Sequence, residues 1–246
     1  MTTLPVAKPP WTSLGKKLES MTRKALYDYK LIDAPKIAIA LSGGKDSLTL
    51  LYLLKAISGR GFPPFELCAI HVSGEFSCGA SLADSFLAPI CHELGVEFIS
   101  VTSSQKRESL ECYSCSRERR RLIFETAKKK GFFTIAFGHH REDSNETLLL
   151  NLLHKAEFAA NLPKVPMHEY GITVIRPLIF IPEKEIVSFA QKYGFSRISC
   201  QCPIGQNSMR KKVKNWISSL EEDFPHIANT FEKLIKEKKI PPMLLV

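Results

Sequence analysis

Residues 36–53 read KIAIALSGGKDSLTLLYL, and this stretch decides the fold. Residues 37–41 form a short continuous apolar run, which is typical of a strand buried on both faces of a parallel sheet. The run stops at a Ser-Gly-Gly turn, and the leucines that follow predict a buried helix. The two glycines permit positive φ and carry no Cβ, so backbone N–H groups can approach a ligand closely. A glycine turn that leads into a helix N-terminus predicts an anion site, and Lys45 adds a positive charge beside it.

The string SGGKDS at residues 42–47 differs from two other phosphate-binding motifs. The Walker P-loop needs Gly, four residues and then Gly-Lys-Ser/Thr, and the dinucleotide fingerprint has another glycine spacing. A bare Ser-Gly-Gly can be an ordinary turn between a strand and a helix. The whole string, with its apolar strand and helix, resembles the signature of the PP-loop ATPases. The resemblance implies a loop that holds the phosphates of ATP, and a reaction that yields an adenylated substrate, AMP and pyrophosphate.

The composition fits a chain with a substantial core and a polyanionic partner. The chain has 246 residues, of which 44% are hydrophobic, and 34 Lys and Arg residues against 25 Asp and Glu residues give a net charge of +9. This excess is as compatible with a merely basic surface as with phosphate neutralisation. The first residues lack the apolar core of a signal peptide, and no apolar run approaches the roughly 20 residues that span a bilayer. We therefore expect a cytoplasmic protein that is not bound to a membrane.

Alternating apolar strands and helices predict an α/β fold with a parallel five-stranded sheet and helices on both faces. The predicted strands are residues 37–41, 65–72, 96–101, 132–137 and 172–175. We expect an N-terminal arm and helix (1–33), a PP-loop ATPase α/β domain (34–198), and a C-terminal cysteine motif with helices packed on the same unit (199–246). Ligands of parallel sheets bind beyond the carboxyl ends of the strands, which is where residues 42–47 lie.

A second turn, GHHRED at residues 138–143, follows the fourth predicted strand and lies at the same edge. Asp143 has two interpretations, as the N-cap of the next helix or as a contact to Mg²⁺ or substrate, and both can hold. Of His139 and His140, we expect one to be a structural imidazole and the other to face the site.

Seven cysteines in a chain without export signals do not favour a disulfide framework. Cys68 and Cys91 lie in apolar contexts typical of packing residues. Four other cysteines form two close pairs, a C-x-x-C motif at Cys112 and Cys115 and a C-x-C-Pro motif at Cys200 and Cys202. Four thiolates can hold a structural zinc, three can hold an iron–sulfur cluster with one open iron, or the thiols can be unrelated. Spacing alone slightly favours zinc.

Several motifs together resemble the tRNA 2-thiocytidine synthetases. They are SGGKDS, then C-x-x-C with Ser-Arg and a basic helix, then GHHREDSNETLLLNLL, VIRPL and a late cysteine cluster, in the family's order over roughly residues 13–235. The resemblance implies that ATP activates the C2 carbonyl of a cytidine at position 32 of the tRNA anticodon loop, and that sulfur then displaces AMP. It also implies a 4Fe-4S cluster held by Cys112, Cys115 and a third cysteine. The family usually has a second C-x-x-C, so an ungapped count selects Cys200, and a short gap would select Cys202.

These arguments define the predicted site residues. The predicted ATP-binding residues are Ala40, Leu41, Ser42, Gly43, Gly44, Lys45, Asp46, Ser47, His71 and Gly138, with Asp46 holding Mg²⁺. The predicted catalytic residues are Lys45, Asp46 and Asp143. The predicted tRNA-binding residues are Arg117, Arg120, Arg121, Arg210, Lys211 and Lys214, which are equally compatible with a solvated basic face. The predicted partners are tRNA and a sulfur donor such as a cysteine desulfurase, and family members are commonly homodimers.

Two other classes of protein remain open at this stage. The first is another PP-loop tRNA enzyme, such as a lysidine-type ligase or a thiouridylase with structural zinc. The second is an RNA-binding module that responds to ATP without turnover, which predicts ATP binding without AMP formation.

Overall fold

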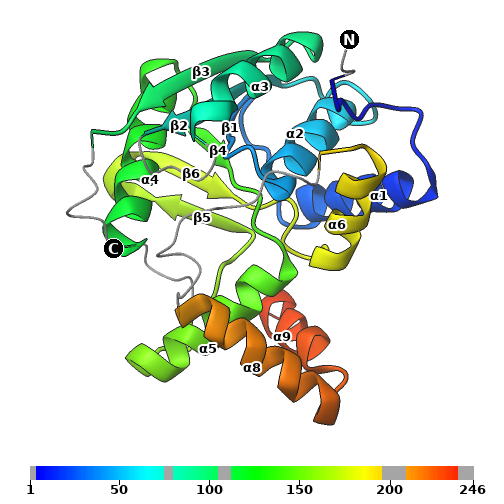
Figure 1. Ribbon diagram of the computed structural model, residues 1–246, viewed down its shortest axis with the longest axis vertical. Helices are drawn as coiled ribbons and strands as arrows, with labels where there is room; N and C mark the ends of the chain where they lie inside the picture. Colours follow the sequence, from blue (N-terminus) through cyan, green and yellow to red (C-terminus); the bar gives the residue numbers. More distant parts are fainter. Residues whose placement is uncertain (1–3, 75–79, 105–111, 196–208, 238–246) are drawn as a thin grey trace.

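The computed structural model describes residues 4–74, 80–104, 112–195 and 209–237. Its sheet has six strands in the order β3-β2-β1-β4-β6-β5 (Figure 1). The strands are β1 (Lys36–Ala40), β2 (Glu66–Ser73), β3 (Glu97–Thr102), β4 (Thr134–Ala136), β5 (Lys164–Met167) and β6 (Ile172–Ile175). The described helices are α1 (Ser13–Asp28), α2 (Lys45–Ile57), α3 (Ala80–Glu93), α4 (Cys112–Lys129), α5 (Arg141–Lys155), α6 (Glu183–Lys192), α8 (Met209–Asp223) and α9 (Ile227–Lys236).

The predicted α/β fold is confirmed, and the predicted strand count needs a correction. Five strands pair in parallel, and the sixth, β5, runs antiparallel to β6. This strand reads Lys-Val-Pro-Met and contains Pro166. Four residues with a proline carry a weak strand signal, yet proline is tolerated at the edge of a sheet, where its missing N–H is not needed. The prediction therefore omitted an edge strand and left the parallel core unchanged.

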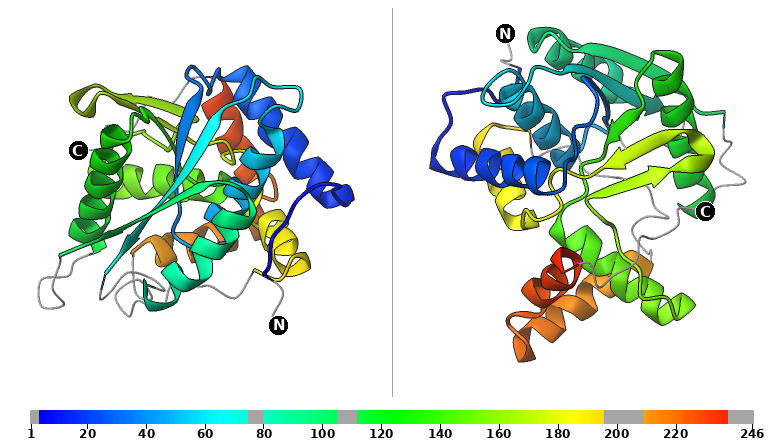
Figure 2. Two further views of the ribbon diagram at one scale, coloured as in Figure 1. Left: turned by 90° about the horizontal axis from the view of Figure 1, so that it is seen from above. Right: turned by 180° about the vertical axis from the view of Figure 1, so that it is seen from behind.

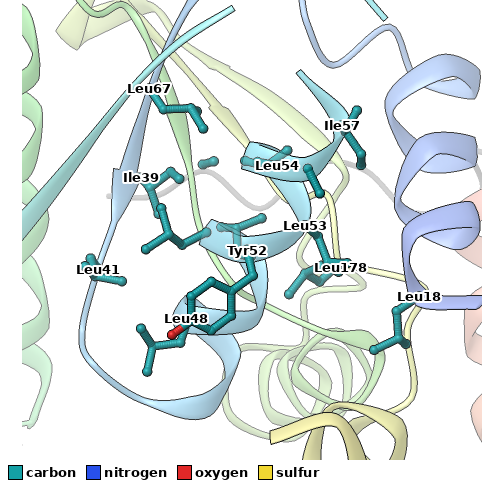
Figure 3. Packing of buried hydrophobic residues seen from close by; sticks show 14 of the residues in the cluster. Leu18, Ile39, Leu41, Leu48, Tyr52, Leu53, Leu54, Ile57, Leu67 and Leu178 are labelled. Atoms are coloured by element: carbon teal, nitrogen blue, oxygen red, sulfur yellow. The ribbon is translucent and has the colours of Figure 1, made fainter. Parts of the chain in front are cut away.

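Alternate residues of β1 face two separate hydrophobic clusters. Ile37 and Ile39 pack with side chains of α1, α2, α3 and α6, whereas Ala38 and Ala40 pack with Ile123 and other residues of α4. Figure 3 shows the first cluster, in which the apolar side of β1 meets α2. The sheet therefore separates α4 from α1, α2, α3 and α6, which lie on its opposite face (Figure 2). Both faces of β1 are buried, as its uninterrupted apolar sequence predicts.

Helices α5, α8 and α9 form a group that projects from the α/β body (Figures 1 and 2). Helix α5 follows β4 directly, and α8 packs along it through its buried residues Val213 and Ile217. The basic residues of α8 are thereby brought beside the start of α5. None of the helices within the described ranges has both the length and the apolar character required to cross a bilayer.

Three of the connections that follow parallel strands lie at the same edge of the sheet. Strand β1 leads into residues 42–44, β4 leads into residues 137–140, and β6 leads into Arg176. Because β1, β4 and β6 are neighbours with the same direction, these connections lie side by side. The C-x-x-C motif was expected in a connection before a basic helix, but α4 begins at Cys112, so the motif forms its first turn.

Candidate active site

A cavity of about 940 Å³ opens at the carboxyl edge of the sheet. Its walls come from the ends of β1, β2, β4 and β6, from the first turns of α2 and α8, from residues 116–123 of α4 and from α5. Among the predicted site residues, the cavity is lined by Ala40, Leu41, Ser42, Asp46, Ser47, His71, Arg120, Gly138, Asp143 and Arg210. Residues that are far apart in the chain therefore share one space.

The turn at residues 42–44 has the geometry of an anion cradle. Gly43 has φ of 84°, a conformation that side chains rarely adopt, and Gly44 is the N-cap of α2. The Ser47 hydroxyl donates to the Gly44 carbonyl at 3.0 Å, and the Gly44 N–H donates to the Ser42 hydroxyl at 3.3 Å. These bonds hold the turn while the remaining N–H groups of the first turn of α2 have no partner within the helix. The turn thus fits the phosphates of a nucleotide.

Gly138 contributes through close packing. A Cβ built at this position would lie 2.9 Å from the carbonyl carbon of Asp46 and 3.0 Å from the Ser47 nitrogen. Real Cβ atoms almost never approach backbone atoms that closely. Gly138 therefore lets the connection after β4 pack directly on the first turn of α2.

The ammonium group of Lys45 joins two carboxylates at the start of α2. Its Nζ lies 3.0 Å from Asp46 Oδ1 and 3.1 Å from Glu183 Oε1. Burial opposes the charged form, but the two carboxylates raise the pKa of Lys45 above its ordinary value. Lys45 therefore stays protonated and supplies positive charge beside the anion cradle.

His140 lies among four carboxylates that come from three elements. Its ring nitrogens lie 3.3 Å from Glu142, 3.5 Å from Asp143, 3.9 Å from Asp46 and 4.0 Å from Glu183. Burial lowers the pKa of His140, but the carboxylates outweigh burial and raise it. Burial raises the pKa of Glu142, but its contact with His140, together with its other partners, outweighs burial and lowers this pKa to about 2. The imidazolium therefore ties the starts of α2, α5 and α6 together.

Asp143 lies inside the first turn of α5, where His140 is the N-cap. The interpretation of Asp143 as the N-cap was therefore wrong by three positions, although its carboxylate still accepts the His140 N–H at 2.9 Å. Arg210 of α8 lies 3.4 Å from its other oxygen. Burial raises the pKa of Asp143, but the cationic neighbours, His140 first, lower it overall. Asp143 is thus an ionised carboxylate at the cavity wall, as a metal or substrate contact requires.

His71 presents an acceptor without a partner to the cavity. It is fully buried at the end of β2, and its Nδ1–H donates to the Leu41 carbonyl at 2.7 Å. A carbonyl only accepts, so Nε2 is the unprotonated nitrogen, and it has no hydrogen-bond partner within the described residues. Burial lowers the pKa of His71, which keeps the ring neutral. A ligand that offers an N–H or O–H donor, such as a nucleoside, fits this position.

Of the two histidines of which one was expected to face the site, His139 lines the cavity and His140 does not. His139 pairs with Arg176, which the sequence did not predict as part of the site, and the two lie on the opposite side of the cavity from His71. Arg176 is 2% exposed and donates from Nε to His139 Nδ1 at 3.1 Å and from Nη1 to the Leu162 carbonyl at 2.8 Å. Burial, reinforced by Arg176, lowers the pKa of His139 to about 3. Burial, reinforced by Arg120, lowers the pKa of Arg176 to about 10. His139 is therefore neutral and Arg176 is a buried cation.

The arginines of α4 separate into two groups. Arg119 and Arg120 line the cavity, and Arg119 was not among the predicted residues. Arg121 lies on the exposed side, where it pairs with Glu118 at 2.9 Å and Glu125 at 2.7 Å. Arg117 is exposed as well. The helical spacing of 119 and 120 relative to the apolar residues of α4 is the signal that could have found Arg119.

The basic residues of α8 also separate into one that lines the cavity and others that do not. Arg210 lines the cavity and also donates to the Thr147 hydroxyl at 3.4 Å. Lys214 pairs with Glu183 at 2.5 Å, and Lys211 is exposed. Lys214 is thus linked, through Glu183, to the Lys45 contact at the anion cradle.

The cysteines can be placed only in part. Cys115 is a half-buried free thiol, and Ser116 beside it lines the cavity. Cys112 begins α4 one turn earlier, so the two α-carbons share a helix face. Cys200 and Cys202 lie outside the described residues, within which no group of three or more Cys, His, Asp or Glu is arranged to hold a metal. Cys68 and Cys91 are fully buried with pKa values raised to about 12 by burial, as packing residues are.

Comparisons with known sequences agree on one family, and a comparison with solved structures shows a similar fold. The PP-loop domain model matches residues 14–215. The tRNA-cytidine(32) 2-sulfurtransferase of Syntrophotalea carbinolica is 33% identical over 225 residues, which are 88% of this chain and 87% of the relative. The protein of the same name from Methylobacillus flagellatus is 35% identical over 239 residues, 93% of this chain and 78% of the relative. The solved U34-tRNA thiolase NcsA from Methanococcus maripaludis, with its 4Fe-4S cluster, has a TM-score of 0.74 at 24% identity and covers 91% of this chain and 79% of its own.

Proposed function

Because the chain belongs to the PP-loop family, among the tRNA-cytidine(32) 2-sulfurtransferases, we propose that it replaces the C2 oxygen of cytidine 32 of a tRNA with sulfur at the expense of ATP. The observation that carries this proposal is that one cavity extends from the anion cradle at residues 42–47 to Ser116 of α4, which directly follows Cys115 of the C-x-x-C motif. One end suits a nucleotide, and the other is bordered by the C-x-x-C helix and by arginines.

The activation step follows from the residues around the cradle. The amides of the first turn of α2, with Ser42 and Ser47, bind the phosphates, and Lys45 neutralises their charge. Asp46 would hold Mg²⁺ on the pyrophosphate, because carboxylate oxygens are the ligands this ion prefers. The cytidine O2 attacks the α-phosphorus, the bond to the β-phosphate oxygen breaks, and pyrophosphate leaves. This step converts a poor leaving group into AMP.

The thiolation step needs sulfur near the activated C2. Cys112, Cys115 and either Cys200 or Cys202 would hold a 4Fe-4S cluster, which supplies an iron that can bind sulfur. The half-buried thiol of Cys115 next to the cavity wall fits this role. Hydrosulfide adds to C2 with its own electron pair, the C2–O bond breaks with its pair leaving on AMP, and the proton of the S–H is lost. The C2=S bond then forms without an oxidant or a reductant.

We infer that tRNA binds across the mouth of the cavity. Arg120 and Arg210 line this space, while Lys211 and Arg117 are exposed on the neighbouring helices. A single-stranded loop suits such a site because its bases can leave the stack and enter a pocket. We further propose a sulfur donor such as a cysteine desulfurase, a homodimeric assembly and a cytoplasmic location, where tRNA is available.

The composition of the metal centre tests the proposal against its zinc-containing alternatives. The chain is purified without oxygen and analysed for iron, sulfide and zinc, together with Cys112→Ala, Cys200→Ala and Cys202→Ala. About four irons per chain, as a 4Fe-4S centre requires, support the proposal. Loss of iron in only one of the two late-cysteine variants identifies the third ligand. Stoichiometric zinc that depends on all four cysteines, without iron, would contradict the cluster and favour a zinc-stabilised PP-loop enzyme.

A further inference from the structure

A stack of two aromatic rings borders the cavity on the side away from His71, and we call this stack the aromatic wall. The rings of Phe137 and His139 stack with their centroids 5.6 Å apart and their planes within 9°, and both residues line the cavity. They follow β4, whereas His71 ends β2 on the other side of β1. A planar ligand such as a nucleobase packs well on such a wall.

Arg176 lies beside this wall as a cation that forms no ion pair with the described residues, although the charge of Asp143 acts on it from a longer distance. It lines the cavity, and the described residues place no carboxylate within 4.0 Å of it. Its Nε and Nη1 donate to the neutral acceptors His139 Nδ1 and Leu162 O. Nη2 makes no hydrogen bond within the described residues. Because a buried charge is costly unless it is hydrogen-bonded, this nitrogen calls for an acceptor from a ligand.

The contact between Arg176 and His139 also decides the hydrogen-bonding character of the wall. Nδ1 of His139 accepts from Arg176, so the proton of the neutral ring is on Nε2. The pair can then offer only donors to a ligand, namely the Nη2 hydrogens of Arg176 and the Nε2–H of His139. A ligand with adjacent acceptors fits, and a ligand with a donor at the same place does not.

Cytosine and uracil differ in this respect. Cytosine N3 is an acceptor next to the O2 acceptor, whereas uracil carries an N3–H donor. Because O2 must face the α-phosphorus at the cradle, N3 is the neighbouring atom that remains free to accept a hydrogen bond. We propose that Phe137, His139 and Arg176, here named the base pocket, hold the target cytosine, with Arg176 donating to N3 and thereby selecting cytosine over uracil. The inference rests on the proposed function, because it takes the substrate to be a pyrimidine of tRNA.

Binding of RNAs that differ by one atom or one base tests the base pocket. Fluorescently labelled anticodon stem-loops carry cytidine, uridine or 3-deazacytidine at position 32, and 3-deazacytidine lacks only the N3 acceptor. Their affinities for the full chain are measured by anisotropy in the presence of an α,β-methylene analogue of ATP. For the unmodified chain we expect cytidine RNA to bind roughly 10- to 100-fold more tightly than the other two, the range for one well-made contact to a base.

Variants of the chain assign the effect to Arg176. In Arg176→Met, the three RNAs should bind within about 3-fold of one another, since the partner of N3 is gone. Arg121→Met also removes one positive charge, but from the outer surface of α4, where Arg121 pairs with Glu118 and Glu125, and it should change the three affinities by an equal factor. Binding of the ATP analogue and the circular dichroism spectrum show whether each variant is folded. If Arg176→Met does not fold, the affinities of the unmodified chain for cytidine RNA and 3-deazacytidine RNA still show whether the N3 acceptor is recognised.

The outcomes separate this inference from the proposed function. Equal binding of the three RNAs by the unmodified chain, or an equal loss for all three in Arg176→Met, overturns the base pocket and assigns Arg176 to a phosphate. If the three RNAs bind equally and 2-thiocytidine is formed, the proposed function is supported and the base pocket is refuted. If the chain binds cytidine RNA more tightly but forms no 2-thiocytidine, the base pocket is supported and the proposed reaction is refuted. A chain that binds none of the RNAs contradicts both.

Discussion

Gly138→Ala tests whether the close contact between the β4 connection and the start of α2 supports the anion cradle. The new Cβ would lie 2.9 Å from the Asp46 carbonyl carbon and 3.0 Å from the Asp46 oxygen. Since ordinary contact begins near 3.4 Å, the two backbone segments must separate by about 0.5 Å. Neither segment is a flexible side-chain end, so the turn at residues 42–47 has to move with α2.

Overpacking of this kind costs about 1–3 kcal/mol in the free energy of unfolding. For a chain of this size that corresponds to a fall in Tm of roughly 2–12 °C. We also expect ATP affinity to fall roughly 10-fold or more, because the amides that bind phosphate are displaced. Thermal unfolding and calorimetric titration with a non-hydrolysable ATP analogue measure the two effects.

Gly74→Ala is the matched control for Gly138→Ala. A Cβ at Gly74 has its nearest neighbour at 3.4 Å, which is ordinary contact, and its φ lies outside the left-handed region. We expect Gly74→Ala to retain the ATP affinity of the unmodified chain and to change Tm little. If Gly138→Ala and Gly74→Ala gave the same Tm and the same ATP affinity, the packing argument would be refuted.

Three further predictions concern charged residues of α4 and α5 at or near the cavity. Burial, reinforced by Asp143, raises the pKa of Glu146 to about 7. The neutral carboxyl group therefore contributes its full stabilisation below pH 4.5, the ordinary pKa, and this stabilisation is lost as the pH rises through about 7. Glu146→Gln should therefore be more stable than the unmodified chain at pH 8.5, by up to about 3 kcal/mol, but not at pH 4; urea unfolding at both values checks this, and a difference independent of pH would count against it. Asp143→Asn keeps an oxygen for the His140 N–H but loses the charge that pairs with His140 and Arg210, so release of pyrophosphate should fall roughly 100-fold and Tm should fall as well. Arg120→Ala should weaken tRNA binding and reduce its salt dependence more than Arg121→Ala, because the Arg121 side chain is already paired with Glu118 and Glu125. Filter binding at two salt concentrations measures both effects, and equal losses of tRNA affinity in the two variants would contradict this prediction.

Local sequence was sufficient for the part of the site that is built from consecutive residues. The apolar run, the glycine turn and the leucine-rich helix at residues 36–53 predict a strand, an anion-binding turn and a helix without knowledge of the rest of the chain. The parallel order of strands also predicts that residues 138–143 lie at the same edge, where the structure places Gly138 and Asp143 in the cavity wall.

Contacts between distant residues could not be predicted in the same way. Arg176 and His139 are 37 positions apart and meet because β4 and β6 are neighbours in the sheet. Before the pairing of strands is known, an arginine before a proline has no visible partner. Likewise, the role of Gly138 depends on how closely two connections approach, which is a property of packing. The same limit applies to Glu183, which reaches Lys45 from a helix late in the chain.

The distinction between Arg120 and Arg121 shows a similar limit for charge. Both belong to one basic run, and their sequence neighbours are alike. One faces the cavity, while the other forms ion pairs with Glu118 and Glu125 on the outer surface. Net charge therefore predicts an anionic partner, and the helix orientation decides which cations face the candidate site.

The measurement that tests the central claim most directly is product analysis of one reaction mixture. The anaerobically purified chain is incubated with ATP, Mg²⁺, sulfide and a tRNA that carries cytidine at position 32, and the nucleosides are then separated and identified by mass spectrometry. The account predicts that 2-thiocytidine forms at that position in a 1:1 ratio to AMP, and that it does not form when ATP is replaced by its α,β-methylene analogue. ATP binding with neither AMP nor 2-thiocytidine would contradict the account and identify an ATP-responsive RNA-binding protein instead.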